Sequence, residues 1–245
     1  MELHILDDGS QFNKTVADWI VKYIGDTLKK QDRFTWVLSG GNTPKALYRL
    51  LASAPYREKV DWEKLHFFWG DERAVPFEDD RNNAKMAYDN LLNKVPVQVS
   101  QIHVMRTDIP PEKSALEYEK ILHHYFPHTS YDSKKTSFDL VLLGMGDDGH
   151  TLSLFPGTEI IHEENAWTKA YFLEAQDMYR ISLTKIIVNK SVRIAFLTTG
   201  SGKAKALKEV LEGEYNPDLY PSQVIEAING ELHWFTDKDA AALLK

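Results

Sequence analysis

With 245 residues, of which 43% are hydrophobic and 27% charged, the chain can form one large α/β domain or two small ones whose core needs no metal or disulfide. Its net charge of −7 gives no electrostatic reason to expect nucleic acid or an anionic membrane as a partner. The absence of cysteine excludes disulfides, thiolate metal sites and a cysteine nucleophile.

The N-terminal residues carry no basic stretch followed by a long apolar segment, so the sequence predicts no signal peptide. No apolar run approaches the ~18 residues that a membrane span requires. We therefore expect a cytoplasmic protein.

Strand-like and helix-like segments alternate along the chain. In chain order we expect a strand at 3–6, a helix at 13–29, a strand at 34–38, a helix ending at 51, a strand at 65–69, helices at 82–92 and 112–126, strands at 140–143, 180–183 and 192–198, a helix at 204–211 and a last strand at 231–235. This alternation predicts a mostly parallel sheet with helices on both faces. Nothing in the composition divides the chain, so we expect a single α/β domain over 1–245, with a polar surface loop at 129–137.

The string SGGNTPKAL follows the strand at 34–38. Gly40 and Gly41 let the backbone approach a ligand closely, Thr43 can cap the next helix, and Pro44 suits its first turn. The free amides of Gly40 to Thr43, including Asn42, would form an anion site suited to a phosphate. The alternative is a tight turn that binds no ligand.

The string GMGDDGH follows the strand at 140–143 and matches the dinucleotide fingerprint literally. We reject that interpretation because Asp147 and Asp148 would repel a pyrophosphate and because Pro156 interrupts the required helix. The pattern also lacks the later ligands of a calcium loop. What remains is Asp148 two residues before His150, a candidate general base with its orienting carboxylate. The alternative is a histidine that makes only a capping or core hydrogen bond.

Two further strings follow strands. Asp71, Glu72 and Arg73 come after the strand at 65–69 and could be either functional or a solvated loop with a local ion pair. The string TTGSGKAKAL is no Walker motif, because Ala204 stands where serine or threonine must hold magnesium. Its Lys203 can still hold a phosphate as a point charge.

The remaining candidates carry little information by themselves. Arg180 is a single arginine at the start of a strand. His123 and His124 lie on a predicted helix and have no ligand spacing, whereas His66, His103 and His233 lie near strand edges. We expect structural roles for all five and predict no metal site.

Taken together, these strings resemble the glucosamine-6-phosphate isomerase/6-phosphogluconolactonase superfamily over most of the chain, from about 39 to 223. The strings that carry the resemblance are SGGNTP, FFWGDERAVP, an Asn-Asn pair at 82–83, GMGDDGHTLSLFPG, RISLT, GSGKAKAL and PSQ. The resemblance implies an α/β fold with a Rossmann-like, mostly parallel sheet of the NagB/RpiA/CoA-transferase-like class.

Within that superfamily the strings look more like the lactonases than the deaminases. Deaminases look like Asp-Glu-Tyr where this chain has Arg73 as the third residue, and they carry a glutamate where this chain has Phe155. Phenylalanine cannot relay a proton. The deaminase/isomerase reading and a non-catalytic sugar-phosphate sensor remain alternatives.

The resemblance implies hydrolysis of 6-phosphoglucono-δ-lactone in the pentose phosphate pathway, without metal or redox cofactor. Its partner would be a small phosphorylated sugar lactone, with no nucleic acid, membrane or obligate protein partner. His150 would be the general base, Asp148 its orienter and Arg73 an oxyanion donor. Asp71 would orient Arg73 or contact sugar hydroxyls. The phosphate would be held by Gly40, Gly41, Asn42, Thr43, Arg180 and Lys203, and the division of work among the three cations stays open.

Overall fold

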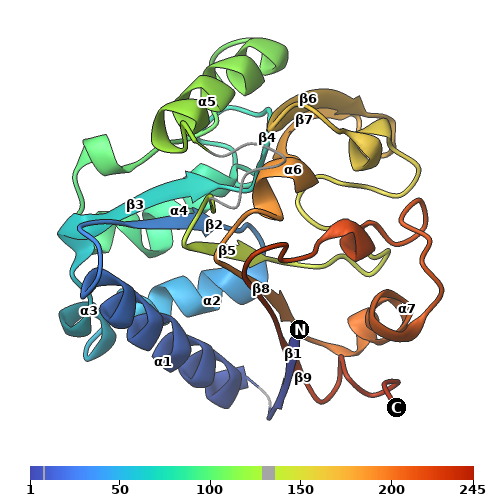
Figure 1. Cartoon of the computed structure of the whole chain (residues 1–245), viewed down its shortest axis with the longest axis horizontal. Helices are drawn as coiled ribbons and strands as arrows, with labels where there is room; N and C mark the ends of the chain where they lie inside the picture. The colour runs from blue at the N-terminus through green and yellow to red at the C-terminus, as the bar shows by residue number, and fades with distance from the viewer. Residues whose placement is uncertain (8, 129–135) are drawn as a thin grey trace.

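The computed structural model describes residues 1–7, 9–128 and 136–245, and a six-stranded sheet forms its centre (Figure 1). All neighbouring strands of this sheet are parallel, as the alternation of the sequence predicted. In spatial order the strands are β1 (Glu2–Leu6), β9 (Glu231–Asp237), β8 (Arg193–Thr198), β5 (Leu140–Leu143), β2 (Phe34–Leu38) and β3 (Leu65–Trp69).

Helices cover both faces of this sheet because its strands are apolar on both sides. Trp36 and Leu38 of β2 face one hydrophobic cluster, whereas Val37 between them faces the other. The first cluster includes side chains of α1 (Gly9–Leu28), α2 (Asn42–Leu51), α3 (Tyr56–Lys59) and α4 (Asn83–Asn90). The second includes side chains of α5 (Pro111–Tyr125), α6 (Lys185–Val188) and α7 (Ala204–Glu212).

A second, three-stranded antiparallel sheet was not predicted. It has the order β4 (Asp71–Arg73), β7 (Met178–Leu183) and β6 (Thr168–Leu173). Residues 71–73, for which a solvated loop was one of two alternatives, therefore form a short strand, and the expected strand at 180–183 does not join the parallel sheet. Strands are predicted from an alternation of apolar and polar residues. β4 consists of charged residues only, and the side chains of β6 do not alternate between buried and exposed, so neither strand shows this pattern.

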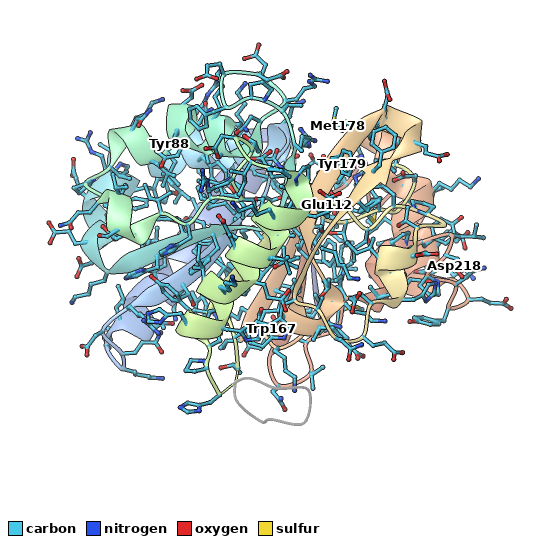
Figure 2. The ribbon with its side chains drawn as sticks, turned by 90° about the horizontal axis from the view of Figure 1, so that it is seen from above. Tyr88, Glu112, Trp167, Met178, Tyr179 and Asp218 are labelled. Atoms are coloured by element: carbon cyan, nitrogen blue, oxygen red, sulfur yellow. The ribbon has the colours of Figure 1, made fainter. Side chains whose placement is uncertain are left out.

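The small sheet is held against the large one and against α5. The Leu183 N–H donates to the Gly70 carbonyl oxygen at 2.8 Å, which links the end of β7 to the end of β3. Figure 2 marks β7 by Met178 and Tyr179, and it shows Trp167 close to α5. Trp167 packs there on His123 with ring centroids 4.0 Å apart.

The other predicted elements are confirmed, with ends that shift by at most a few residues. The expected loop at 129–137 lies largely outside the described residues. Short 3₁₀ helices occupy several connections: η1 (Trp62–Lys64), η2 (Leu92–Lys94), η3 (Val99–Gln101), η4 (Glu159–His162), η5 (Glu174–Gln176), η6 (Ser201–Lys203) and η7 (Pro221–Val224). Among the described helices, none has both the length and the apolar character needed to cross a membrane.

The strand order places a crevice between β2 and β5. From β2 the chain continues outward to β3, whereas from β5 it continues in the opposite direction to β8 and β9. The loops that leave the carboxyl ends of β2 and β5 therefore diverge. Open α/β sheets bind their ligands at such a switch point.

Candidate active site

A cavity of about 400 Å³ lies at this switch point. The loops after β2, β5 and β8 line it, together with β4 and β7 of the small sheet. The structure brings these sequence-predicted residues to its wall: Gly40, Gly41, Asn42, Thr43, Asp71, Arg73, His150, Arg180 and Lys203. Asp148 is not part of this wall but contacts His150, which is. Strings that are far apart in sequence thus meet in one place.

The N-terminus of α2 opens into the cavity. Gly41 is the N-cap at φ 100°, a conformation that favours glycine, and no side chain of the described residues caps the helix. The first amides of a helix have no intrahelical partner, so those of Asn42 and Thr43 are available to an anion. The expectation that Thr43 caps α2 was wrong. The helix already begins at Asn42, and the Thr43 hydroxyl instead lies 2.8 Å from the Thr199 hydroxyl.

This threonine contact joins the α2 loop to the loop that carries Lys203. The loop that carries Lys203 is attached to the end of β9, because the Gly200 N–H donates to the Asp237 carboxylate at 2.9 and 3.0 Å. Lys203 lines the cavity and makes no ion pair or side-chain hydrogen bond within the described part of the chain. A free ammonium group and a helix N-terminus therefore face the same space.

His150 and Asp148 form the expected pair. His150 Nδ1 lies 2.6 Å from Asp148 Oδ1, and the same oxygen accepts the His150 backbone N–H at 3.1 Å. Burial raises the pKa of Asp148, but the hydrogen bond to His150 and the charge of His150 together lower it by more, so the pKa lies below its usual value. The carboxylate can only accept, so Nδ1 carries the proton and Nε2 is left as the basic nitrogen.

Phe155 holds the other side of this histidine. Its ring stacks on the His150 ring with centroids 4.0 Å apart and planes inclined by 20°. The Arg180 guanidinium lies over the same phenyl ring, 5.4 Å from its centroid. Phe155 thus places an apolar face, and no proton donor, beside the basic histidine.

Asp71 pairs with Arg180 and not with Arg73, which corrects the expectation that Asp71 orients Arg73. Arg180 Nη2 donates to Asp71 Oδ2 at 2.8 Å, and both side chains are buried. The Ser153 hydroxyl donates to the same oxygen at 2.7 Å and accepts from Arg180 Nε at 2.9 Å. Burial raises the pKa of Asp71, but attraction to Arg180 and Arg73 outweighs it, so the pKa lies below its usual value.

The Arg73 guanidinium keeps N–H donors that are available to a bound ligand. Its Nη1 donates to the Arg81 carbonyl oxygen at 2.8 Å, while its Nε is buried without a partner among the described residues. A buried donor without an acceptor is costly unless a bound ligand supplies one. Arg73 is therefore better placed than Arg180 to contact a ligand in the cavity.

Glu72, beside it, has a structural role. Its carboxylate accepts the N–H groups of Arg73, Asn83 and Ala84 at 2.8, 2.7 and 2.8 Å, which ties β4 to the start of α4. Burial raises its pKa to about 7, although these three donors oppose the shift. The carboxylate points toward the helix start and is absent from the cavity wall.

Sequence reasoning missed three contributors to the site. Ser153 bridges Asp71 and Arg180, Asn83 donates to the Asp71 carbonyl oxygen at 2.9 Å, and Thr199 holds Thr43. All three lie in sequence strings that point to the site, yet the sequence predicts no role for them. Only their long-range partners identify them, and no local pattern predicts such partners.

The fold and the cavity define an open α/β protein whose ligand crevice combines a helix N-terminus, a free lysine and a His–Asp pair. The chain belongs to the family of glucosamine-6-phosphate isomerases/6-phosphogluconolactonase, which matches residues 7–234.

Named relatives support this membership. The chain is 39% identical to the probable 6-phosphogluconolactonase 3, chloroplastic, of Oryza sativa subsp. indica, over 99% of this chain and 76% of the relative. It is 37% identical to the 6-phosphogluconolactonase of Haemophilus influenzae, over 84% of this chain and 86% of that protein. The crystal structure of 6-phosphogluconolactonase from Thermotoga maritima superimposes with a TM-score of 0.82 at 27% identity, covering 97% of this chain and 99% of that one.

Proposed function

We propose that this protein hydrolyses 6-phosphoglucono-δ-lactone to 6-phosphogluconate. The observation that carries the proposal is the 2.6 Å His150–Asp148 pair at a cavity that also holds a helix N-terminus and a free lysine. The His150–Asp148 pair suits general-base catalysis, whereas the helix N-terminus and the lysine together suit the binding of a phosphate. Relatives that match nearly the whole chain carry the name of this activity.

The reaction uses water as the nucleophile. His150 Nε2 takes a proton from water as its oxygen attacks the lactone carbonyl carbon, and Asp148 stabilises the imidazolium that forms. The tetrahedral intermediate carries a negative oxygen, and we assign its stabilisation to Arg73, which lines the cavity and whose Nε is buried without a partner among the described residues. When the intermediate collapses, the bond to the ring oxygen breaks and His150 returns its proton to that oxygen.

The phosphate is assigned to the α2 N-terminus and Lys203. The amides of Asn42 and Thr43 and the Lys203 ammonium face one cavity, and none of them has a partner among the residues that the structure describes. Arg180 is the weaker candidate for direct contact, because its guanidinium already donates to Asp71, Ser153 and Gln176. We therefore assign Arg180 to positioning Asp71 and the cavity wall.

We also propose that residues 1–245 act as one domain. The cavity takes its wall from both sheets, and the Leu183–Gly70 hydrogen bond joins them directly. Neither sheet carries the complete site, which supports a single functional unit.

The test is lactone hydrolysis itself. We would generate 6-phosphoglucono-δ-lactone in situ and follow proton release above the spontaneous rate, with glucosamine 6-phosphate and ammonia detection in parallel. Acceleration of lactone opening without ammonia release is expected, since Phe155 offers no proton relay beside His150. Ammonia release would move the protein to the deaminase branch, and inactivity in both assays would leave the sensor as the better explanation.

Lys203→Ala is expected to raise KM for the lactone by about 10–100-fold with little change in kcat, because a charged hydrogen bond remote from the reacting carbon is lost. Steady-state kinetics measure both constants. Lys205→Ala is the matched control, since Lys205 is an exposed lysine of α7 outside the cavity wall. An unchanged KM in Lys203→Ala would remove Lys203 from the phosphate site.

Gly146→Ala is expected to lower kcat by about 10²-fold through misplacement of the base. A methyl group at this position would overlap both His150 Nδ1 and Asp148 Oδ1. At Gly25, in α1 and outside the cavity wall, no atom lies within 4 Å of an added methyl group, so Gly25→Ala is the matched control and is expected to stay near wild-type activity. Equal kcat values in the two variants would contradict the role assigned to the pair.

A further inference from the structure

A second cluster of ionisable side chains lies at the amino-terminal ends of β1 and β9, whereas the active site lies at the carboxyl ends of the strands. Glu2 and His4 are two residues apart on β1 and therefore share one face of the sheet. In the parallel register Glu2 is paired with His233 of β9, which brings His233 to the same face. His4 and His233 are 229 positions apart in the sequence, so no local pattern reveals this grouping.

The three ligand-type atoms form a nearly equilateral triangle. His4 Nε2 lies 3.3 Å from His233 Nδ1 and 3.6 Å from Glu2 Oε2, and His233 Nδ1 lies 3.4 Å from Glu2 Oε2. The contact between the two histidines is a long hydrogen bond, and both contacts with Glu2 exceed the common N–H···O range of about 2.7–3.2 Å. They match the roughly 3.3–3.4 Å between ligands that a tetrahedral metal at about 2.0–2.1 Å from each would impose.

The surroundings fix the ligands as metal sites usually require. The second nitrogen of His233, Nε2, lies 3.2 Å from Glu231 Oε2, and Arg193 Nε contacts the same carboxylate oxygen at 2.6 Å. A carboxylate behind a ligating histidine holds the ring and its tautomer. The His4 ring stacks on Phe235 with centroids 4.5 Å apart, so its plane is fixed as well.

We propose that Glu2, His4 and His233 bind one divalent transition-metal cation of the zinc class, with a solvent molecule as fourth ligand. Two imidazoles and one carboxylate favour such a cation over Mg²⁺ or Ca²⁺, which prefer oxygen ligands. The Glu2 side chain is 61% exposed and that of His233 only 3%, so the site opens to solvent on the side of the edge strand. The cation would fasten β1 to β9 and would not take part in catalysis.

The test is titration of metal-free protein, prepared without a histidine tag, with Zn²⁺ in a calorimeter and with Co²⁺ in a spectrophotometer. We expect one equivalent of each to bind, the visible absorption of four-coordinate Co²⁺, a higher Tm with Zn²⁺ and no competition from Mg²⁺. Glu2→Gln and His4→Ala are each expected to weaken binding at least tenfold and to abolish the Tm increase. Glu231→Gln should weaken it by about 10–100-fold through the loss of the supporting carboxylate.

His124→Ala is the matched control, because His124 is an exposed histidine of α5 outside the cluster and should bind metal like wild type. Glu2→Gln and His4→Ala change exposed or half-buried side chains, so binding can be measured on folded protein even if a His233 variant fails to fold. Failure of wild type to bind one equivalent, or unchanged binding in both Glu2→Gln and His4→Ala, would overturn the proposal.

Discussion

Replacing His150 with alanine is expected to lower kcat for lactone hydrolysis by about 10²–10⁴-fold while KM changes little. The reason is that Nε2 of His150 is the basic nitrogen at the cavity, and its partner Asp148 fixes the tautomer through the 2.6 Å contact with Nδ1. The phosphate site is separate from this pair, so substrate binding should persist. Steady-state rates, corrected for spontaneous opening, give both constants.

A second His–Asp pair in the chain provides the control. His162 Nε2 lies 2.7 Å from Asp218 Oδ1, with both side chains exposed and away from the cavity. Figure 2 shows Asp218 at the edge of the molecule. His162→Ala should therefore leave kcat unchanged. Near wild-type kcat in His150→Ala would show that another group activates the water.

Removing the buried guanidinium in Arg180→Met is expected to lower the free energy of unfolding by about 3–5 kcal/mol, because Asp71 would keep a buried negative charge without its cation. The Arg180 side chain is 3% exposed and that of Asp71 11%, so both charges are largely shielded from solvent in the folded protein. Activity should fall too, since both residues line the cavity. Urea unfolding at neutral pH measures the effect.

The pH dependence of the stability difference between wild type and Arg180→Met tests the Asp71–Arg180 pair further. The folded-state pKa of Asp71 is below its usual value, so the pair stabilises the fold fully above the unfolded pKa, about 3.9, and loses that stabilisation as the pH falls through the folded pKa. The stability gap between wild type and Arg180→Met should therefore narrow below about pH 4.

An exposed ion pair gives the comparison. The Arg106–Asp108 pair has side chains 49% and 69% exposed, so Arg106→Ala should change stability little at any pH. An Arg180→Met variant as stable as wild type at neutral pH would mean that Asp71 is uncharged or repartnered in the folded protein.

Local chemistry explains why much of the site could be predicted from the sequence. The apolar runs at 34–38, 65–69 and 140–143 are buried on both faces, so composition alone identifies them as parallel strands. Each ends in glycine or polar residues, and the carboxyl ends of parallel strands share one edge of the sheet. Asp148 and His150 are two residues apart, so their contact needs only the local turn.

Other features depended on partners that the linear order does not reveal. β4 has three residues with charged side chains, and only pairing with β7 makes it a strand. For the same reason the expectation that Asp71 orients its local neighbour Arg73 was wrong, since its partner Arg180 lies 109 positions away in the sequence.

Local features of the amino-acid sequence are enough to predict the parallel α/β sheet, the loops that meet at its carboxyl edge and the His150–Asp148 pair, because burial pattern, glycine positions and short spacing act within a few residues. The tertiary structure alone decided the small antiparallel sheet, the pairing of Asp71 with Arg180 across 109 residues, and the grouping of His4 with His233. Each of these contacts joins residues that are far apart in the sequence, and only the packing of the whole chain brings their side chains within bonding distance.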